Sequence, residues 1–245
     1  MIKLSVIIPT YNEEHYIEAA LKSVTFADEI IVIDSFSDDN TVAIAEKYTS
    51  KIFQRKFDNF SNQKNYALSQ ATGEWVLFLD ADERVTHSLE NEILEVIQNP
   101  EHEGYKINFP HFFMNRFLYH HDDDVIRLVR RDKAKFTGTV HEKLDVDGSI
   151  GQLKNFMLHF TYKGLHHYIQ KKESYAWFQA EQLYAKNKKT TYFHLFFKPF
   201  YRFFNSVFIR GSFRDGIPGI TVAVLDAYGV FQRYVKLILL HRKMK

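Results

Sequence analysis

Short apolar segments with the composition of buried β-strands alternate with helical segments over residues 1–100, and this alternation restricts the possible folds most strongly. Strands are predicted over residues 4–8, 29–34, 51–54 and 75–79. Helices are predicted over residues 12–23, 41–48, 60–71 and 86–98, with Asn12 capping the start of the first and Gly73 capping the end of the third. Because strand–helix–strand connections are right-handed, we expect an α/β fold with a mostly parallel sheet flanked by helices.

Polar side chains cluster directly after three of the predicted strands, over residues 10–14, 34–40 and 80–84. In open parallel sheets, ligands bind beyond the carboxyl ends of the strands, so we expect the site there. None of the three turns carries a Gly-rich phosphate-binding sequence, which argues against a GxGxxG dinucleotide site and against a P-loop. The candidate ligand-binding groups are therefore the side chains of these turns.

Asp80 and Asp82 follow the fourth predicted strand and are two residues apart, so they can point to the same side. Adjacent carboxylates repel each other unless a cation joins them, and their oxygens suit Mg²⁺ or Mn²⁺. The alternative is that these acids cap the following helix and face solvent. Asp34 could bind a ribose or a base, or simply form a turn. Lys64 could reach a phosphate, or remain a solvated surface lysine.

The two parts of the chain carry opposite charge, although the whole has a formal net charge of only +2. Residues 1–150 hold 16 Lys and Arg against 26 Asp and Glu, a net −10, whereas residues 151–245 hold 16 against 4, a net +12. A basic segment of this kind is typical of contact with nucleic acid or with an anionic membrane. The chain has no cysteine, which excludes disulfides, thiolate metal sites and a cysteine nucleophile.

Aromatic residues recur every three or four positions between Tyr192 and Phe213, with Lys198, Arg202 and Arg210 among them. This spacing predicts an amphipathic helix whose apolar side either packs against the rest of the protein or lies in a lipid interface. We favour an anionic membrane surface and predict no nucleic-acid partner, because no nucleic-acid-binding signature accompanies the aromatics. We expect neither a signal peptide nor an ordinary transmembrane helix, because the apolar runs are too short or interrupted by charge.

Three segments resemble the donor-binding signatures of family 2 glycosyltransferases. They are LSVIIPTYNEE at 4–14, EIIVIDSFSDDNT at 29–41 and GEWVLFLDADE at 73–83. Their order and spacing match as well, and three ordered motifs are far more specific than a single DxD sequence. The resemblance implies a GT-A (Rossmann-like) fold, a nucleotide-sugar donor and inversion of the anomeric configuration.

The resemblance also implies roles for individual residues. The first motif would lie near the nucleotide, and Asp34 matches the acid that recognises the base or ribose. Asp80 and Asp82 match the DxD motif that holds a divalent cation against the diphosphate of the donor. The expected nucleotide-sugar-binding residues are Pro9, Thr10, Tyr11, Glu13, Asp34, Lys64, Asp80, Ala81 and Asp82.

Later segments narrow the resemblance to the lipopolysaccharide core glucosyltransferase branch. They are residues 127–131, 136–138, 140–142, His159 and residues 211–227. This branch implies a UDP-sugar such as UDP-glucose and a lipid-anchored glycan acceptor such as lipopolysaccharide core. Glu142 matches the position of the catalytic carboxylate that deprotonates the acceptor hydroxyl, with Asp145 or Asp147 as alternatives.

The expected metal residues are Asp82, Asp80 and His159, which would hold Mg²⁺ or Mn²⁺. His159 lies in an apolar stretch, where a histidine is at least as often a core residue as a ligand. The arginines within residues 127–131 could stabilise the charge of the leaving group, or face outward along a strand.

The resulting hypothesis is a metal-dependent inverting hexosyltransferase built from two parts. Residues 1–164 would form the GT-A catalytic domain, with a nucleotide-sugar-binding half over 1–100 and an acceptor half over 101–164. Residues 165–245 would form a basic, aromatic, helical extension that makes the protein peripheral on the inner, cytoplasmic face of the cell membrane. Two alternatives use the same features: a nucleotidyltransferase on a similar sheet, and a noncatalytic membrane or nucleic-acid adaptor.

Overall fold

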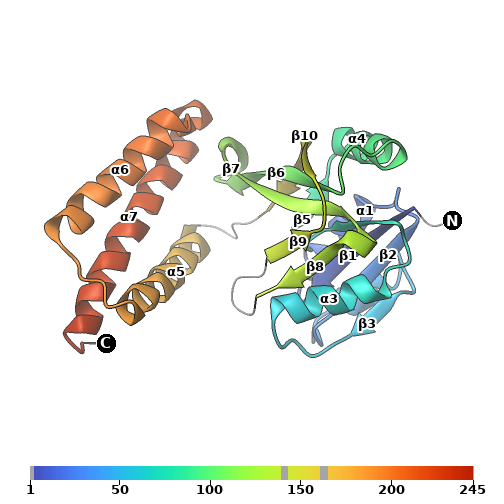
Figure 1. Ribbon diagram of the computed structural model, residues 1–245, viewed down its shortest axis with the longest axis horizontal. Helices are drawn as coiled ribbons and strands as arrows, with labels where there is room; N and C mark the ends of the chain where they lie inside the picture. Colours follow the sequence, from blue (N-terminus) through green and yellow to red (C-terminus); the bar gives the residue numbers. More distant parts are fainter. Residues whose placement is uncertain (1–2, 139–142, 161–164, 245) are drawn as a thin grey trace. The chain divides into compact units, whose positions relative to one another are not determined.

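The computed structural model describes residues 3–138, 143–160 and 165–244. The chain forms two compact units, each with its own apolar core (Figure 1). The first unit contains Met1–Phe109 and Asp123–His159, and the second contains Pro110–Asp122 and Phe160–Lys245. The predicted domains, with a boundary after residue 164, stay a prediction.

Within the described residues, a sheet with the strand order β3-β2-β1-β4-β7-β6-β10-β5 forms the centre of the first unit. Its strands are β1 (Leu4–Thr10), β2 (Glu29–Asp34), β3 (Ile52–Gln54), β4 (Trp75–Phe78), β5 (Glu83–Val85), β6 (Gly104–Phe113), β7 (Arg116–Arg130) and β10 (Ile150–His159). Strands β3, β2, β1 and β4 are parallel neighbours, whereas β7 is antiparallel to β4 and β5 is antiparallel to β10. The predicted α/β sheet is confirmed, and its parallel part is the part in which the sequence alternates strand and helix.

Helices cover both faces of this sheet (Figure 1). They are α1 (Ile17–Lys22), α2 (Thr41–Ala45), α3 (Phe60–Gln70) and α4 (His87–Gln98). Val6 and Ile8 of β1 are buried on one face with Leu21 of α1 and Ile93 of α4. Ile7 lies on the other face, together with α3 and the small antiparallel sheet of β8 (Ala134–Thr137) and β9 (Lys143–Val146). Alternate side chains of β1 point to opposite faces of the sheet, so this one strand packs against both helical layers.

Two predicted features of the helix boundaries are wrong. Helix α1 begins at Ile17 rather than at residue 12, because Asn12 has a left-handed backbone (φ 53°) and bonds the loop after β2 instead. Gly73 does not cap α3, because that helix ends at Gln70 and its C-cap is Ala71, which is extended. The amide of Gly73 donates to Ser5 Oγ (2.9 Å), and a Cβ at residue 73 would meet that oxygen at 2.6 Å. Close packing against β1 therefore explains this glycine.

The segment over residues 137–151 contains β9 (Lys143–Val146). In the part of it that the structure describes, β9 pairs with β8 through the partners Phe136 and Leu144. Both side chains are buried in the core beneath α3, so the segment is held by apolar contacts that lie far apart in the sequence.

The second unit is helical and also contains the tip of the β6–β7 hairpin. Its helices are α5 (Leu165–Ala185), α6 (Lys198–Phe204), with π-helical turns at Phe193–Phe197 and Asn205–Ile209, and α7 (Gly216–His241), preceded by a 3₁₀ turn at Ser212–Asp215. Phe113 and Leu118 of the hairpin tip are buried with Tyr168 and Val222. The predicted basic, aromatic, helical extension is confirmed as a set of helices. Among the described helices, none combines the length and the apolar character needed to cross a bilayer.

Candidate functional site

The loops after β1 and β2 form one edge of the site. The two strands are in parallel register, with Thr10 opposite Asp34, so their carboxyl ends lie together. Asn12 N donates to Ser37 Oγ (2.9 Å), and Asp38 N donates to Asn12 Oδ1 (3.0 Å). Asparagine tolerates a left-handed backbone, which lets this one residue join both loops. Two of the three predicted polar clusters are thus fixed to each other.

Asp34 is fully buried at this edge. Its carboxylate accepts hydrogen bonds from Ser37 N (3.0 Å) and Ser37 Oγ (2.5 Å), and a longer one from Gln54 Nε2 (3.3 Å). These bonds fix the turn after β2 to the end of β3, so Asp34 has the turn-forming role weighed from the sequence. Its recognition of a base or ribose stays a prediction.

The third polar cluster forms a tight turn after β4. Asp80 N donates to the Glu83 carboxylate (2.8 Å), and Glu83 N donates to the Asp80 carbonyl oxygen (2.9 Å). Strand β5 then pairs with the end of β10, which places His159 opposite Glu83. As a result His159 Nε2 lies 3.4 Å from Asp82 Oδ2. Two of the three residues predicted as metal ligands are therefore neighbours, although they lie far apart in the sequence.

A buried arginine of β7 contacts the same turn. Arg127 donates to Asp80 Oδ2 (2.8 Å) and to Glu83 Oε1 (2.5 Å), and its guanidinium lies over the ring of Phe109 at 5.1 Å from the centroid. One cation therefore serves two carboxylates, and its guanidinium also lies over an aromatic ring. Sequence reasoning left the role of this arginine open and did not identify Glu83 as its partner.

The other two arginines of residues 127–131 are not at the site. Arg130 lies opposite Trp75 at the start of β4, and it pairs with Glu74 (3.0 Å) and Glu103 (3.3 Å). Arg131 donates from Nε to the carbonyl oxygen of Gly73. Both lie at the amino end of β4, opposite the edge that carries Asp80, so the leaving-group role considered for them is wrong.

Arg127 and burial together set the charge of the turn. Burial alone would raise the pKa of Asp80, but the positive charges of Arg127 and Lys64 outweigh it and hold that pKa well below its ordinary value. Burial raises the pKa of Glu83 to about 7 even though Arg127 opposes the shift, and the nearby charge of Asp80 adds to it. Asp80 is therefore ionised at neutral pH, whereas the pKa of Glu83 is close to neutral pH.

A cavity of about 640 Å³ opens over these groups. It is lined by Pro9, Thr10, Tyr11, Glu13, Ser35, Lys56, Phe57, Gln63, Lys64, Asp80, Ala81 and Asp82. Every residue predicted to bind the nucleotide sugar lines this cavity, with the exception of the buried Asp34. Its size is within the range of small-molecule sites in proteins.

Four lining residues were not predicted: Ser35, Lys56, Phe57 and Gln63. Lys56 and Phe57 follow shortly after β3, so the rule that ligands bind beyond strand ends could have identified them. Gln63 lies on α3 and is held by Arg55 (2.8 Å) and by Ser35 Oγ (3.0 Å). Nothing in its local sequence signals this role.

The hydroxyl of Thr10 is a candidate contact for a ligand in the cavity. Within the described residues, the buried hydroxyl oxygen of Thr10 has no hydrogen-bond partner. Leaving a buried hydroxyl unpaired costs about 1–3 kcal/mol, so such groups in native proteins are normally satisfied by a ligand or water. Thr10 therefore favours a polar ligand in this cavity.

The described groups at the turn do not hold a metal ion by themselves, so a divalent cation would share its shell with a ligand. Within the described residues, no group of three or more His, Asp or Glu side chains is placed to hold a metal ion alone. Burial lowers the pKa of His159, but the hydrogen bond and charge of Asp82 outweigh burial and leave it raised. Asp80 Oδ2 is engaged by Arg127. Mg²⁺ commonly binds one or two carboxylates and completes its shell with phosphates and water, which this set allows.

The predicted catalytic base, Glu142, lies outside the described residues. Of its alternatives, Asp145 accepts a hydrogen bond from Thr137 Oγ1 (2.7 Å) and pairs with Lys143 (2.9 Å). The hydrogen bonds from Thr137 and Lys143 lower the pKa of Asp145, which weakens it as a base. Asp147 is exposed in the turn after β9.

The family model described as "Glycosyl transferase family 2" matches residues 5–206, which is most of the chain. The chain belongs to glycosyl transferase family 2. The resemblance carried by the three donor motifs is thereby confirmed, and the cavity is the candidate donor site of a glycosyltransferase.

Similar proteins extend over nearly the full length of this glycosyltransferase. An uncharacterized glycosyltransferase of Rickettsia conorii is 30% identical over 256 residues, covering 96% of this chain and 89% of the relative. The lipopolysaccharide core biosynthesis glycosyltransferase LpsC of Rhizobium meliloti is 26% identical, covering 98% and 93%. The crystal structure of S. aureus TarS 1–349 in complex with UDP-GlcNAc aligns with a TM-score of 0.50 at 17% identity, covering 99% and 92%. The expected GT-A fold is confirmed.

Proposed function

We propose that this glycosyltransferase moves a hexose from a UDP-sugar to a lipid-anchored glycan, such as lipopolysaccharide core, with inversion at the anomeric carbon. The observation that carries the proposal is the 640 Å³ cavity, because residues of the first and third donor motifs line it together and Asp34 of the second is fixed beside it. The UDP-GlcNAc bound by TarS supports a UDP-sugar donor. The name of LpsC supports a lipopolysaccharide acceptor.

In this proposal, different residues at the cavity bind different parts of the donor. The loop after β1 binds the nucleotide, Asp34 beside the cavity holds the loop after β2 in place for it, and Lys64 faces the diphosphate. Asp82, His159 and Asp80 would hold Mg²⁺ or Mn²⁺, which supplies positive charge where the leaving diphosphate gains negative charge. Arg127 orients Asp80 through its 2.8 Å hydrogen bond and keeps it ionised.

Donor binding is tested by titrating the full-length protein with UDP, UDP-glucose and UDP-GlcNAc in a calorimeter, with and without Mn²⁺. We expect one UDP-sugar to bind only with metal, and Asp82→Asn to weaken that binding at least tenfold because one ligand oxygen is lost. Asp132→Asn, a change of the same kind at an exposed residue of the turn before β8, serves as the control. Absence of binding across the panel would contradict the proposal, and incorporation of nucleotide instead of sugar would indicate a nucleotidyltransferase.

The base is tested separately by single-turnover transfer. Glu142 would remove the proton of the acceptor hydroxyl, so Glu142→Gln should leave UDP-sugar affinity unchanged and slow transfer by about 10²–10⁴-fold. Asp145→Asn should slow transfer far less. A normal rate in Glu142→Gln, or a larger loss in Asp145→Asn, would show that another group is the base.

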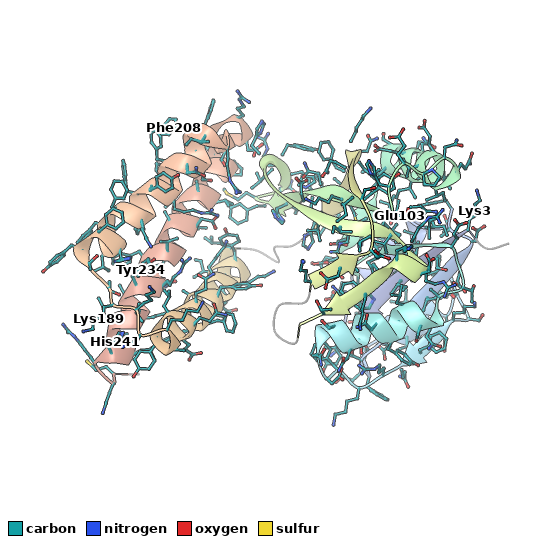
Figure 2. The ribbon with its side chains drawn as sticks, viewed as in Figure 1. Lys3, Glu103, Lys189, Phe208, Tyr234 and His241 are labelled. Carbon is teal, nitrogen blue, oxygen red and sulfur yellow. The ribbon has the colours of Figure 1, made fainter. Side chains whose placement is uncertain are left out.

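Peripheral contact with an anionic membrane surface completes the proposal. Phe196 and Phe200 are each 64% exposed, and Phe208, at the outer end of the helices in Figure 2, is 58% exposed. Exposed Arg210 and Arg214 lie nearby in the sequence and can meet anionic lipid. Wild type should float with vesicles that contain phosphatidylglycerol, and a Phe196→Ser, Phe200→Ser double variant should not, while still binding UDP. Equal flotation of both would contradict this part.

A further inference from the structure

A second cavity, of about 530 Å³, lies inside the helical unit between α5, α6 and α7. Its lining is cationic: Lys172, Arg202 and Arg233 come from the three different helices, and Asp226 is the single acidic residue among the described lining residues. The formal charge of these four side chains is therefore positive by two. Lys172 and Arg202 are 32% and 37% exposed, so the excess can draw an anion from solution into the cavity.

Asp226 compensates only part of this charge. Its buried carboxylate accepts a hydrogen bond from Tyr168 Oη (2.8 Å) and pairs with Lys172 Nζ (2.5 Å) and with Arg202 (2.8 Å). Both oxygens of Asp226 are thus engaged by cations on α5 and α6. The third cation of the lining, Arg233, forms no ion pair with it.

Arg233 has donor capacity that the protein does not use. Its Nε is buried, and no described residue accepts a hydrogen bond from it. The guanidinium carbon lies 5.9 Å from the ring centroid of the neighbouring Tyr234, which Figure 2 places among the helices. A buried donor left unpaired is unfavourable, and a guanidinium fork matches the oxygens of a phosphate.

Gly229 leaves open space in the wall of the same cavity. It lies inside α7, where glycine is less favourable than alanine, yet a Cβ built there would meet no atom within 4 Å. Packing between protein segments therefore does not account for the missing side chain. The open space at this position leaves room for a ligand to approach the α7 backbone.

The cavity opens on the side of α7 that faces away from the exposed aromatic surface. Asp226, Gly229 and Arg233 line it, whereas Val224 and Tyr228, which are offset by about half a turn, are both 50% exposed and line an apolar groove with α6. The two faces of one helix are thus chemically different. The cationic face suits a polar head group, and not an acyl chain.

We propose that this cavity binds a phosphorylated group, such as a phosphate monoester or a diphosphate, which is either free in solution or carried on a lipid. The charge excess of two, the unused donor of Arg233 and the open space at Gly229 each point to it. None of these observations depends on the donor site, which lies in the other unit.

The test is calorimetric titration of the full-length protein with pyrophosphate at constant ionic strength, with saturating UDP added so that the donor cavity is occupied. We expect Arg233→Gln to weaken pyrophosphate binding at least tenfold. Gly229→Leu should abolish it while preserving or raising the melting temperature, because the added side chain fills the space and favours the helix. Arg242→Gln, at an exposed arginine after α7, removes the same charge elsewhere and should bind as wild type does.

The source of the phosphate is separated by competition. If vesicles containing phosphatidic acid displace pyrophosphate, and phosphatidylcholine vesicles do not, the site accepts a lipid-carried phosphate; if neither displaces it, the ligand is soluble. Either result supports the cavity as a phosphate site. Absence of pyrophosphate binding, or equal binding by wild type, Arg233→Gln and Gly229→Leu, would overturn it. UDP affinity is measured in the same samples, so failure here is distinct from failure of the proposed donor site.

Discussion

Arg127 decides how two acidic side chains are tolerated at the edge of the donor cavity. Its guanidinium is 10% exposed and contacts both Asp80 and Glu83, and the Glu83 side chain is wholly buried. Without this cation, burial would favour the protonated form of both acids. A protonated Asp80 would be a poor ligand for a divalent cation. Arg127 therefore acts on the chemistry of the turn through Asp80.

We expect Arg127→Gln to lower the free energy of unfolding by about 3–5 kcal/mol, because it removes one partner from a buried ion pair. Arg130→Gln on the same strand should cost less than about 1 kcal/mol, since the pairs of Arg130 with Glu74 and Glu103 are partly exposed. Urea unfolding of both variants measures the difference. Similar losses in the two would show that the Arg127 network adds nothing beyond a surface pair.

Sequence reasoning could not separate these arginines. Both lie next to apolar residues and are three positions apart, and the difference between them is which end of β4 they meet. That depends on antiparallel pairing between segments about fifty residues apart, which periodicity does not encode. For the same reason His159 was linked to Asp82 by family resemblance alone. The pairing of β5 with β10 supplies the physical reason.

At the scale of elements, Glu29 joins four segments at the start of β2. Its buried carboxylate contacts Ser5 of β1 and Lys51 before β3, and accepts hydrogen bonds from the backbone and hydroxyl of Thr72 (both 2.9 Å). Burial alone would raise the pKa of Glu29, but hydrogen bonds from Lys51, Ser5 and Thr72 outweigh it and lower that pKa to about 2. The ionised form is therefore part of the folded sheet.

This shift predicts a definite pH dependence. Because the folded pKa lies below the unfolded value of 4.5, the contribution of Glu29 is complete above pH 4.5 and is lost as the pH falls toward 2. Glu29→Gln should cost up to about 3 kcal/mol at pH 7, and the gap to wild type should close over that window. Urea unfolding between pH 7 and pH 2.5 measures it, with the exposed Glu46→Gln as control. A gap that is constant with pH would contradict the assignment.

Helices and strands were predictable where the burial of a segment can be recognised from the residues of that segment alone. Strands β1, β2 and β4 are apolar on both faces because helices cover both sides of the sheet, and the sequence carries that as continuous apolar runs. Asn12 and Gly73 were misassigned because their partners, Ser37 and Ser5, lie 25 and 68 residues away. Most lining residues of the donor cavity were predictable because they follow strand ends.

At the scale of the whole molecule, the two units are not consecutive in sequence. The hairpin tip Pro110–Asp122 belongs to the helical unit although it is inserted between strands of the first. Asp215 before α7 accepts hydrogen bonds from the amides of Tyr119 (3.2 Å) and His120 (2.9 Å), which fixes the tip. A cut after the last strand therefore does not separate the two units cleanly.

A fragment of residues 1–159 should accordingly bind more of the hydrophobic dye ANS than the full-length protein. Phe113 and Leu118, which are buried against Tyr168 and Val222, lose their cover in that fragment. Replacing both with serine in the same fragment should reduce the dye signal. Equal fluorescence of fragment and full-length protein, at matched concentration, would show that the tip does not need the helices.

Because of this insertion, the ribosome makes the hairpin tip before it makes the helices that cover it. The hairpin tip leaves the exit tunnel well before α7, which carries Val222 and supplies part of its apolar cover. At ordinary rates of synthesis, the interval between Phe113 and Val222 is roughly 5–20 s. During that time the sheet can fold while Phe113 and Leu118 of the β6–β7 hairpin remain exposed to water. We therefore expect the nascent chain to expose these two side chains to chaperones until α7 is made.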